Sequence, residues 1–374
     1  NMTADAGDFL GTSVAVFGDH MVAVAALENY GNLYFYRRIG EQWVFQSRRA
    51  ASQSGVGTGI RPYLYDKSGS RMILGGAFGQ FIIVRFDGEV WRTEPIAAGV
   101  IESNPAATGV AIDGDRAVVT YVGLRKIKVL AFDGSSWLVE SEWMLPDAGW
   151  NQYTLLSADL ESDRLLIGHP AKTIAGTSSV GEVLVYQRQG ALWSLDAILM
   201  PPEVEADLRF GFSVALDGDL IAAGAWGDDV GARANAGSVS VFRKVGGSWT
   251  LEHTLTPDAT PADGGFGWRS RFAGGHLYVS QYGTLPAAFD GGLFEYDLST
   301  QTPTILNHLV QPGFYDRLGT GFDVVGSELF AGTPGRSIGG GIKAFARVGS
   351  NWVLNQLIQQ EASVPASGFG HEVA

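Results

Sequence analysis

The stretch from Arg209 to Thr260 reads RFGFSVALDGDLIAAGAWGDDVGARANAGSVSVFRKVGGSWTLEHTLTPDAT and contains four short apolar runs. The runs are Phe212–Leu216, Leu220–Ala225, Ser238–Arg243 and Trp249–Leu255. Three of them alternate apolar and polar residues, and turn residues separate them, which is typical of β-strands joined by hairpins. Asp217-Gly218-Asp219 favours a tight turn between the first two. The stretch therefore predicts a four-stranded antiparallel meander of about 50 residues, close to one propeller blade.

The same pattern recurs along the rest of the chain. The first strand recurs at Leu10–Val16, Thr108–Ile112, Gly265–Phe272, Leu318–Val324 and Phe369–Ala374. The third strand recurs at Gly31–Arg38, Gly79–Phe86, Lys126–Phe132, Gly181–Arg188, Gly291–Asp297 and Gly341–Arg347. A tryptophan marks the fourth strand in every copy except the sixth, which has Thr300–Leu306: Trp43, Trp91, Trp137, Trp193, Trp249 and Trp352.

These repeats predict one domain over residues 1–374. The copies span approximately 9–50, 56–97, 105–147, 150–203, 209–260, 265–313 and 317–362, and 369–374 is the opening strand of an eighth. A single copy cannot bury its own faces, whereas copies stacked in a ring bury each other. We therefore expect an all-β fold, a seven-bladed β-propeller of four-stranded antiparallel blades. A tryptophan that recurs once per copy is expected to pack between blades.

Composition limits the classes of partner. The chain has 26 Lys and Arg against 39 Asp and Glu, a formal net charge of −13, which disfavours nucleic acids and anionic membranes. No apolar run is long enough to span a bilayer, so we expect no membrane insertion. There is no cysteine, which excludes disulfides, thiol nucleophiles and zinc–thiolate sites.

The repeat resembles the FG-GAP repeat of integrin-α-type β-propellers. The residues that carry the resemblance are Phe210-Gly211, Ser213-Val214-Ala215, Gly218-Asp219, Gly224-Ala225 and Gly237–Phe242. Gly332-Thr333-Pro334 and Gly168-His169-Pro170 are similar to the "GAP" element. The resemblance covers essentially the whole chain and implies a propeller that serves as a secreted or cell-surface adhesion or interaction module.

Many members of this family hold calcium in a loop between the first two strands, and this chain departs from that pattern. Its corresponding turns, such as Asp113-Gly114-Asp115 and Asp217-Gly218-Asp219, are too short to wrap an ion in several oxygens. We interpret these aspartates as turn-forming residues. The sequence therefore predicts no metal site and no cofactor.

No catalytic motif is present. The sequence has neither a phosphate-binding G-x-x-x-x-G-K-[ST] loop nor a G-x-S-x-G nucleophile elbow, and its six histidines are scattered over different copies. His169, in a long loop, is the best placed of them. An enzyme on this scaffold would need a deep cleft with paired acid and base groups, and no such pair is visible. The prediction is a protein that is not an enzyme.

The loop of the fifth copy is the first candidate binding site. It combines an aromatic ring, two carboxylates, a guanidinium and an amide in Trp226, Asp228, Asp229, Arg233 and Asn235. Sugar sites and protein-binding hot spots both use such groups. The alternative is a loop that only caps its own blade. Further aromatic and polar residues are expected to face the same region: Trp150, Asn151 and Tyr153 at the start of copy four, and Trp268 at the start of copy six.

The central channel is the second candidate. Arg269 stands in the column of small first-strand residues such as Ser13 and Ser213, and Arg271, Arg61 and Tyr63 lie near it. Asp159 and Asp323 stand in the column of Ala15, Ala111 and Ala215. Two interpretations stay open: an ion-pair network between blades, or a polar floor for a ligand.

These observations predict a recognition module that binds a protein partner through its variable loops. The first alternative is a lectin-type propeller that binds a glycan through Trp226 and neighbouring loops. A further alternative is a structural repeat protein that self-associates through the spare strand Phe369–Ala374.

Overall fold

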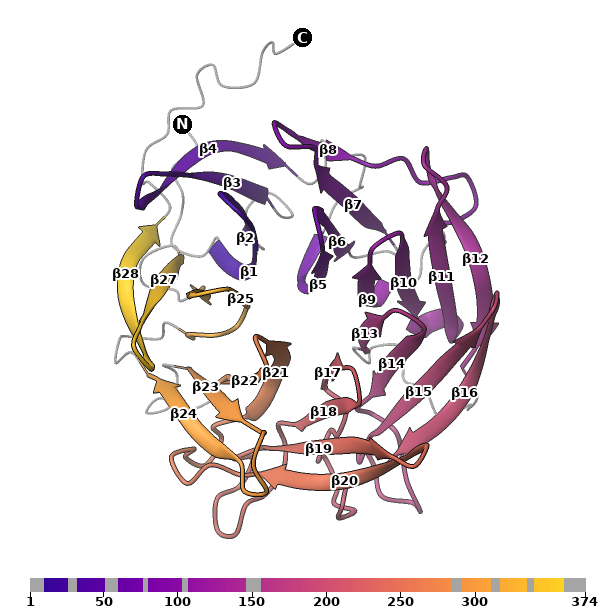
Figure 1. The fold of residues 1–374 in the computed structure, drawn as a ribbon. Helices are drawn as coiled ribbons and strands as arrows, with labels where there is room; N and C mark the ends of the chain where they lie inside the picture. The colour runs from indigo at the N-terminus through magenta and orange to yellow at the C-terminus, as the bar shows by residue number, and fades with distance from the viewer. Residues whose placement is uncertain are drawn as a thin grey trace.

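The structure, a computed structural model, describes residues 10–25, 32–50, 60–76, 80–102, 107–145, 156–283, 291–310, 317–334 and 340–359. These residues form seven antiparallel sheets of four strands arranged in a ring, which confirms the predicted seven-bladed all-β propeller (Figure 1). One short 3-10 helix, Val122–Leu124, is the sole helical element of the described ranges. None of the helical structure found there could cross a membrane.

The blades follow one another in chain order, with the first strand of each nearest the axis (Figure 1). Blades one to four comprise β1 (Leu10–Phe17), β2 (His20–Ala25), β3 (Asn32–Ile39), β4 (Gln42–Ala50); β5 (Ile60–Ser68), β6 (Arg71–Gly76), β7 (Phe81–Phe86), β8 (Trp91–Thr93); β9 (Ala107–Asp113), β10 (Arg116–Tyr121), β11 (Lys126–Phe132), β12 (Trp137–Met144); and β13 (Ser157–Glu161), β14 (Arg164–His169), β15 (Glu182–Gln189), β16 (Leu192–Leu199). Blades five to seven comprise β17 (Ser213–Asp217), β18 (Leu220–Ala225), β19 (Ser238–Val245), β20 (Ser248–Leu255); β21 (Phe266–Ala273), β22 (His276–Gln281), β23 (Gly292–Asp297), β24 (Thr304–Leu309); and β25 (Phe322–Val325), β26 (Glu328–Thr333), β27 (Gly341–Val348), β28 (Asn351–Gln359).

The core consists of apolar layers between blades. All of β1 is buried, whereas the outer strand β20 is largely exposed. In the layer between blades seven and one, Val14 packs in the same cluster as Phe330 and Ile342. Burial of apolar area between neighbours is therefore the dominant favourable contribution to the ring.

The ring closes without exchanging strands between its ends. All four strands of blade one come from residues 10–50, and all four of blade seven come from residues 322–359. A parallel bridge joins Leu10 to Gly340, matching the Phe266–Gly237 bridge between blades five and six. The strand at the inner position of blade one is thus Leu10–Phe17, and the spare copy Phe369–Ala374 lies outside the described residues.

Glycine at these bridges permits close approach of two blades. Gly237 has a φ of +87°, and a Cβ there would lie 2.1 Å from the carbonyl oxygen of Phe266. Gly340 is similar, with a φ of +85° and a distance of 2.5 Å to the carbonyl oxygen of Leu10. Any side chain would therefore push the neighbouring backbone away.

One register position of the innermost strands organises the channel. Its seven residues face equivalent positions of the second strands and are Ala15, Asp66, Ala111, Asp159, Ala215, Arg271 and Asp323. The predicted column of Asp159 and Asp323 with the alanines is confirmed, and Asp66 and Arg271 complete it. The blade after each aspartate carries an alanine at the same register position.

Each of these aspartates joins two neighbouring blades by hydrogen bonds. Asp323 accepts N–H bonds from Val324 on its own strand, at 3.0 Å, and from Val16 on blade one, at 2.8 Å. Asp66 accepts in the same way from Lys67 and Ile112, and Asp159 from Leu160 and Leu216. The alanine of the receiving blade leaves room for the incoming carboxylate. Carboxylates that accept backbone N–H groups make strong hydrogen bonds.

The polar run Asp66–Ser70, whose residue types favour a long turn, is mostly strand. Strand β5 continues to Ser68, and Gly69 and Ser70 form the turn. The polar residues remain in the strand because they have partners on other blades: Lys67 donates to the carbonyl oxygen of Val16 at 2.6 Å and pairs with Asp323.

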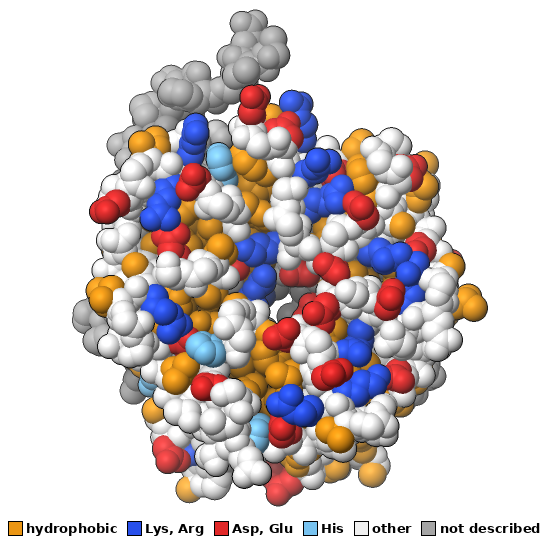
Figure 2. Space-filling view, in the orientation of Figure 1, with side chains coloured by type: hydrophobic (Ala, Val, Ile, Leu, Met, Phe, Trp, Pro, Cys, Tyr) orange, Lys and Arg blue, Asp and Glu red, His pale blue; other side chains and the backbone are white. Residues whose placement is uncertain are grey.

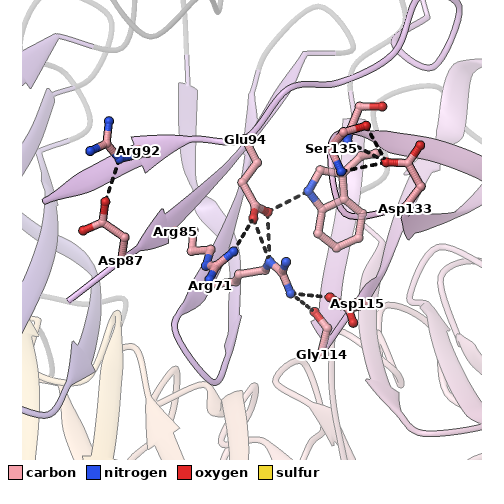
Figure 3. Close-up of polar contacts among 11 residues, drawn as sticks. Arg71, Arg85, Asp87, Arg92, Glu94, Gly114, Asp115, Asp133 and Ser135 are labelled. Atoms are coloured by element: carbon pink, nitrogen blue, oxygen red, sulfur yellow. Dashed lines mark hydrogen bonds and ion pairs between the residues drawn. The ribbon is translucent and has the colours of Figure 1, made fainter. Parts of the chain in front are cut away.

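The outer-strand tryptophans pack between blades. Trp137 is fully buried, and its Nε1 donates to Glu94 Oε2 of blade two at 2.8 Å. Arg71 holds the same carboxylate through Nε at 2.9 Å, and its Nη1 reaches Asp115 on blade three (Figure 3). Trp352 repeats the arrangement with Glu295. Blade six, which lacks the tryptophan, stacks His308 on the Phe294 ring instead, with centroids 3.9 Å apart.

We predict that Asp323→Ala destabilises the ring by about 3 kcal/mol, because it leaves the Lys67 ammonium and the Val16 N–H without their buried acceptor. Urea unfolding measures the effect. Asp115→Ala is the matched control: its carboxylate is exposed and pairs with Arg71, so the expected loss is below about 1 kcal/mol. An equal loss of unfolding free energy in the two variants would show that the bonds of Asp323 to Val16 and Lys67 do not stabilise the ring.

We also predict that Trp137→Phe costs about 2 kcal/mol more in unfolding free energy than Trp193→Phe. Both changes keep an aromatic ring, but Trp137 loses its bond to Glu94, whereas the buried Nε1 of Trp193 has no hydrogen-bond partner in the described structure. Thermal and urea unfolding of the pair give the difference. A cost that is the same at both positions would show that ring packing alone matters.

Candidate functional site

A cavity of about 420 Å³ occupies the channel. Inner strands of blades two to seven contribute to its wall, with aromatic rings and charged groups among the lining residues. Figure 2 shows the central opening of the ring with acidic and basic side chains around it. The arrangement combines an apolar wall with a polar floor, which is typical of small-molecule sites.

The mouth of the cavity carries four half-buried aromatic side chains, the aromatic row: Phe212, Trp226, Trp268 and Tyr282. Trp268 stacks on Tyr282, with ring centroids 4.2 Å apart and planes inclined by 20°. Phe212 lies 4.6 Å from Trp268, and Trp226 lies 6.0 Å from it. The rings meet because the first strand of a blade begins where its antiparallel second strand ends.

Two arginines flank the aromatic row. The guanidinium of Arg209 lies 4.7 Å from the Trp226 ring centroid, and that of Arg317 lies 5.0 Å from the Tyr282 ring centroid. Each residue has a positive φ in the linker that precedes an innermost strand. Cation–π contact of this kind holds a guanidinium flat on a ring.

The floor is a network of charged groups. Arg271 Nε lies 3.7 Å from Asp323, and its Nη1 lies 4.0 Å from Asp66 on the far side of the channel. Tyr65 donates its hydroxyl proton to the carbonyl oxygen of Phe322 at 2.9 Å. Blades two, six and seven are therefore joined across the axis, which supports the interpretation of an inter-blade ion-pair network.

Burial shifts the pKa values of the floor. It raises the pKa of Asp159 to about 7, with the nearby Asp66 charge as a second cause. Burial also raises the pKa of Asp66 and lowers that of Lys67. Two neighbouring carboxyl groups with raised pKa values, Asp66 and Asp159, thus line the cavity, and no sequence motif revealed this combination.

Arg269 lies between the aromatic row and the floor. At its register position the innermost strands of blades one, three, four, five and seven carry small neutral residues, among them Ser157 and Ser213. Its guanidinium stacks 5.0 Å from the Tyr65 ring centroid on blade two. The long side chain thus reaches across space that its counterparts leave open.

The fifth-copy loop mostly caps its own blade. Arg233 donates from Nη1 to the carbonyl oxygens of Pro257, Asp258 and Thr260 at 3.1, 3.1 and 2.6 Å. Asn235 donates from its backbone to Asp229 at 2.8 Å and from Nδ2 to Asp263 at 2.9 Å. These bonds tie the loop to the following linker, so its polar groups are engaged structurally.

The structure thus unites only part of the predicted site. Trp226, Trp268 and Arg269 gather at the channel, whereas Asp228, Asp229, Arg233 and Asn235 do not line the cavity. Burial raises the pKa of Asp228, whose carboxylate accepts a bond from Ser238. Other predicted residues, Trp150, Asn151 and Tyr153, and the side chains of Arg61 and Tyr63, lie outside the described part.

Sequence reasoning missed Phe212, Tyr282, Asp66 and Lys67. Strand register could have revealed the two charged residues. When β5 and β1 are aligned on the turns that end them, Asp66 takes the position of Ala15 in the column. Phe212 and Tyr282 carried no comparable signal, because each adjoins a strand end and meets its partner only in the ring. The described residues contain no group of three His, Asp or Glu side chains that could hold a metal ion.

Comparisons with known proteins agree with the architecture. A family model described as an FG-GAP repeat matches residues 193–242. A solved structure from Bacteroides uniformis, provisionally described as a 6-phosphogluconolactonase, is 14% identical with a TM-score of 0.59, covering 86% of this chain and 90% of that one. A Lactobacillus plantarum protein is 12% identical with a TM-score of 0.59, covering 89% and 93%. No curated protein matches the sequence significantly.

The Bacteroides protein corrects one prediction. The chain was expected not to be an enzyme, and that prediction is corrected because a propeller of the same fold carries the description of an enzyme. The sequence could not exclude catalysis, because acid groups that meet from different blades leave no motif. At 14% identity the similarity shows the shared fold alone. The protein is therefore a seven-bladed β-propeller in which residues 193–242 match the FG-GAP repeat.

Proposed function

We propose that the protein is a recognition propeller that binds a carbohydrate at the mouth of its channel. The observation that carries the proposal is the 420 Å³ cavity, whose lining joins Phe212, Trp268 and Tyr282 to hydroxyl and charged groups. Aromatic side chains offer apolar surface to the C–H faces of a sugar, and planar polar groups bind its hydroxyls. The volume suits a ligand of one or two sugar rings.

The other parts of the sequence prediction remain predictions. These are a protein partner on the variable-loop face, self-association through Phe369–Ala374, and a secreted or cell-surface location. Arg233 and Asn235 hold the fifth-copy loop in one conformation, which would suit a rigid protein-binding surface.

A second candidate function is the hydrolysis of a sugar lactone in the same cavity. Asp159 favours it, because a carboxyl group with a pKa of about 7 is poised to act as a general base. Asp159 would take a proton from water, hydroxide would add to the lactone carbonyl, and the proton would return to the departing ring oxygen. The neighbour's described activity supplies the class of substrate to test.

We predict that Trp268→Ala abolishes binding in a glycan-array screen, because Trp268 lies between Phe212 and Tyr282 in the cavity wall. Trp226→Ala should weaken binding less, since Trp226 touches the row but does not line the cavity. Trp193→Ala on the outer strand β16 is the control and should bind normally. Binding that survives in Trp268→Ala would remove the aromatic row from the site.

For the lactone reaction we predict a rate that rises with pH through about 7. The base must be ionised, so activity is present above the pKa of Asp159 and is lost below it. Asp159→Asn should remove the enzymatic rate at every pH. The control is Asp115→Asn, which changes an exposed carboxylate outside the cavity lining. Hydrolysis of glucono-δ-lactone and its 6-phosphate, corrected for the spontaneous rate, gives the profile; a flat profile would exclude Asp159 as the base.

A further inference from the structure

Resting on the proposed carbohydrate site, we infer that the bound sugar carries a protonated amine, as glucosamine does, and that the Asp159 carboxylate binds this amine. Asp159 lines the cavity, so a ligand there would meet it. Of the three aspartates in the column, Asp66 and Asp323 each have a cationic side chain within 4.0 Å. No cation of the described residues comes that close to Asp159.

Asp323, at the same position of blade seven, shows how an ammonium group completes such a carboxylate. Its oxygens accept backbone N–H bonds from Val324 on its own strand and from Val16 on blade one. The ammonium of Lys67, which comes from blade two, pairs with the same carboxylate. An aspartate of the column can therefore hold two backbone N–H groups and one ammonium at once.

Asp159 has the two backbone partners of this arrangement but lacks the ammonium. Leu160 donates to its Oδ1 at 2.9 Å, and Leu216 on blade five donates to its Oδ2 at 2.7 Å. A carboxylate offers about four acceptor positions, so roughly two remain available. Lys67 stands one residue after the column, two blades beyond its aspartate, and the corresponding residue for Asp159 is Phe272. A phenyl ring supplies no positive charge, so a ligand ammonium can take that place.

The groups that surround Asp159 leave its charge uncompensated. Burial raises the pKa of Asp159 to about 7, the Asp66 charge on β5 raises it further, and Arg271 on β21 opposes both. Leu166, its partner on β14, and Ala215, at the same position of blade five, are uncharged. An ammonium beside the carboxylate would favour the ionised form and lower this pKa.

The charged side chains of the cavity wall are distributed unevenly around the axis. The carboxylates belong to blades two to four and the arginines to blade six: Asp66, Asp113 and Asp159, and Arg269 and Arg271. Lys67, on the acidic side, is already paired with Asp323. Figure 2 shows acidic side chains to the right of the central opening and basic ones to its left. The wall formed by blades three and four therefore attracts a positive charge.

The rest of the cavity wall suits the sugar itself. Trp268 and Phe212 each precede the column residue of their strand by three residues, which places them about 10 Å along the channel from the level of Asp159. Ser157 and Ser213 lie between these levels, and serine hydroxyls can bind sugar oxygens. A ligand of two rings can therefore contact the aromatic row with one ring and Asp159 with the amine of the other.

Isothermal titration calorimetry of the full chain at pH 7 tests the inference with the β-1,4-linked dimers of glucosamine, N-acetylglucosamine and glucose. We expect the glucosamine dimer to bind about tenfold more tightly than the glucose dimer, the usual gain for a charge-assisted bond. The acetylated dimer, which lacks the charge, should show no such gain. Asp159→Asn should remove the difference between the glucosamine and glucose dimers. The control Asp115→Asn, which changes an exposed carboxylate outside the cavity lining, should keep it.

Proton release is a second measurement, and it needs no variant. At pH 6 the carboxyl group of Asp159 is mostly protonated, and it must ionise to pair with an ammonium. The amine is already protonated at this pH, so binding of the glucosamine dimer should release about one proton and binding of the glucose dimer none. Titrations in two buffers of different ionisation enthalpy count the protons.

Phe272→Lys tests the same assignment without changing Asp159. The substitution places an ammonium where Lys67 stands relative to Asp323, so it should occupy the carboxylate and abolish both the amine preference and the proton release. Phe272 is partly buried against the apolar layer between blades five and six, so urea unfolding must first show that the variant folds.

The outcomes separate the inference from the function on which it rests. Equal binding of the glucosamine and glucose dimers, or an amine preference that survives in Asp159→Asn, would overturn the inference alone. Putrescine that binds as tightly as the glucosamine dimer and releases a proton, with no binding of the glucose dimer, would support the amine site and overturn the carbohydrate proposal. If no compound binds, both proposals fail. Should neither variant fold, a glucosamine dimer that binds the native protein without proton release would equally refute the assignment.

Discussion

Each blade of this protein has two apolar faces, and neither can be buried without a neighbour. This constraint explains the ring: only a closed circle gives every sheet a partner on both sides. The apolar layer between blades seven and one, where Val14 and Phe330 pack, is built like the other inter-blade layers. Closure therefore needs no shared strand, since burial of apolar surface supplies the free energy at the junction as it does elsewhere.

Polar groups decide how neighbouring blades are aligned. Asp66, Asp159 and Asp323 each join two inner strands through one carboxylate, and the next blade always carries alanine at the same level. At the outer edge, Glu94 and Glu295 receive the indole N–H of the following blade. Such charge-assisted bonds lose strength quickly with distance and angle, so they select one register of blade against blade.

The same network gives the channel its chemistry. Asp66 and Asp159, which join neighbouring blades, also line the cavity, and burial raises their pKa values. Residues with a structural role can therefore also bind a ligand or take part in a reaction. Above this floor the aromatic row and Arg269 form a different environment, apolar and cationic. The two levels lie within one cavity because the innermost strands run along its wall from mouth to floor.

By itself the sequence determined the number of blades, the order of strands and the place of Asp159 and Asp323 in the column of alanines, because these depend on local alternation, turn residues and a repeat in register. It also indicated Trp226, Trp268 and Arg269 as unusual residues. Only the tertiary structure decided that Arg233 and Asn235 serve their own loop, and that Asp66 and Lys67 belong to a strand. It alone brought Tyr65, Phe212 and Tyr282 to the cavity from blades distant in sequence. The physical reason is that blade-to-blade contacts are set by packing around the ring, and no local pattern in the chain encodes which side chains meet across its axis.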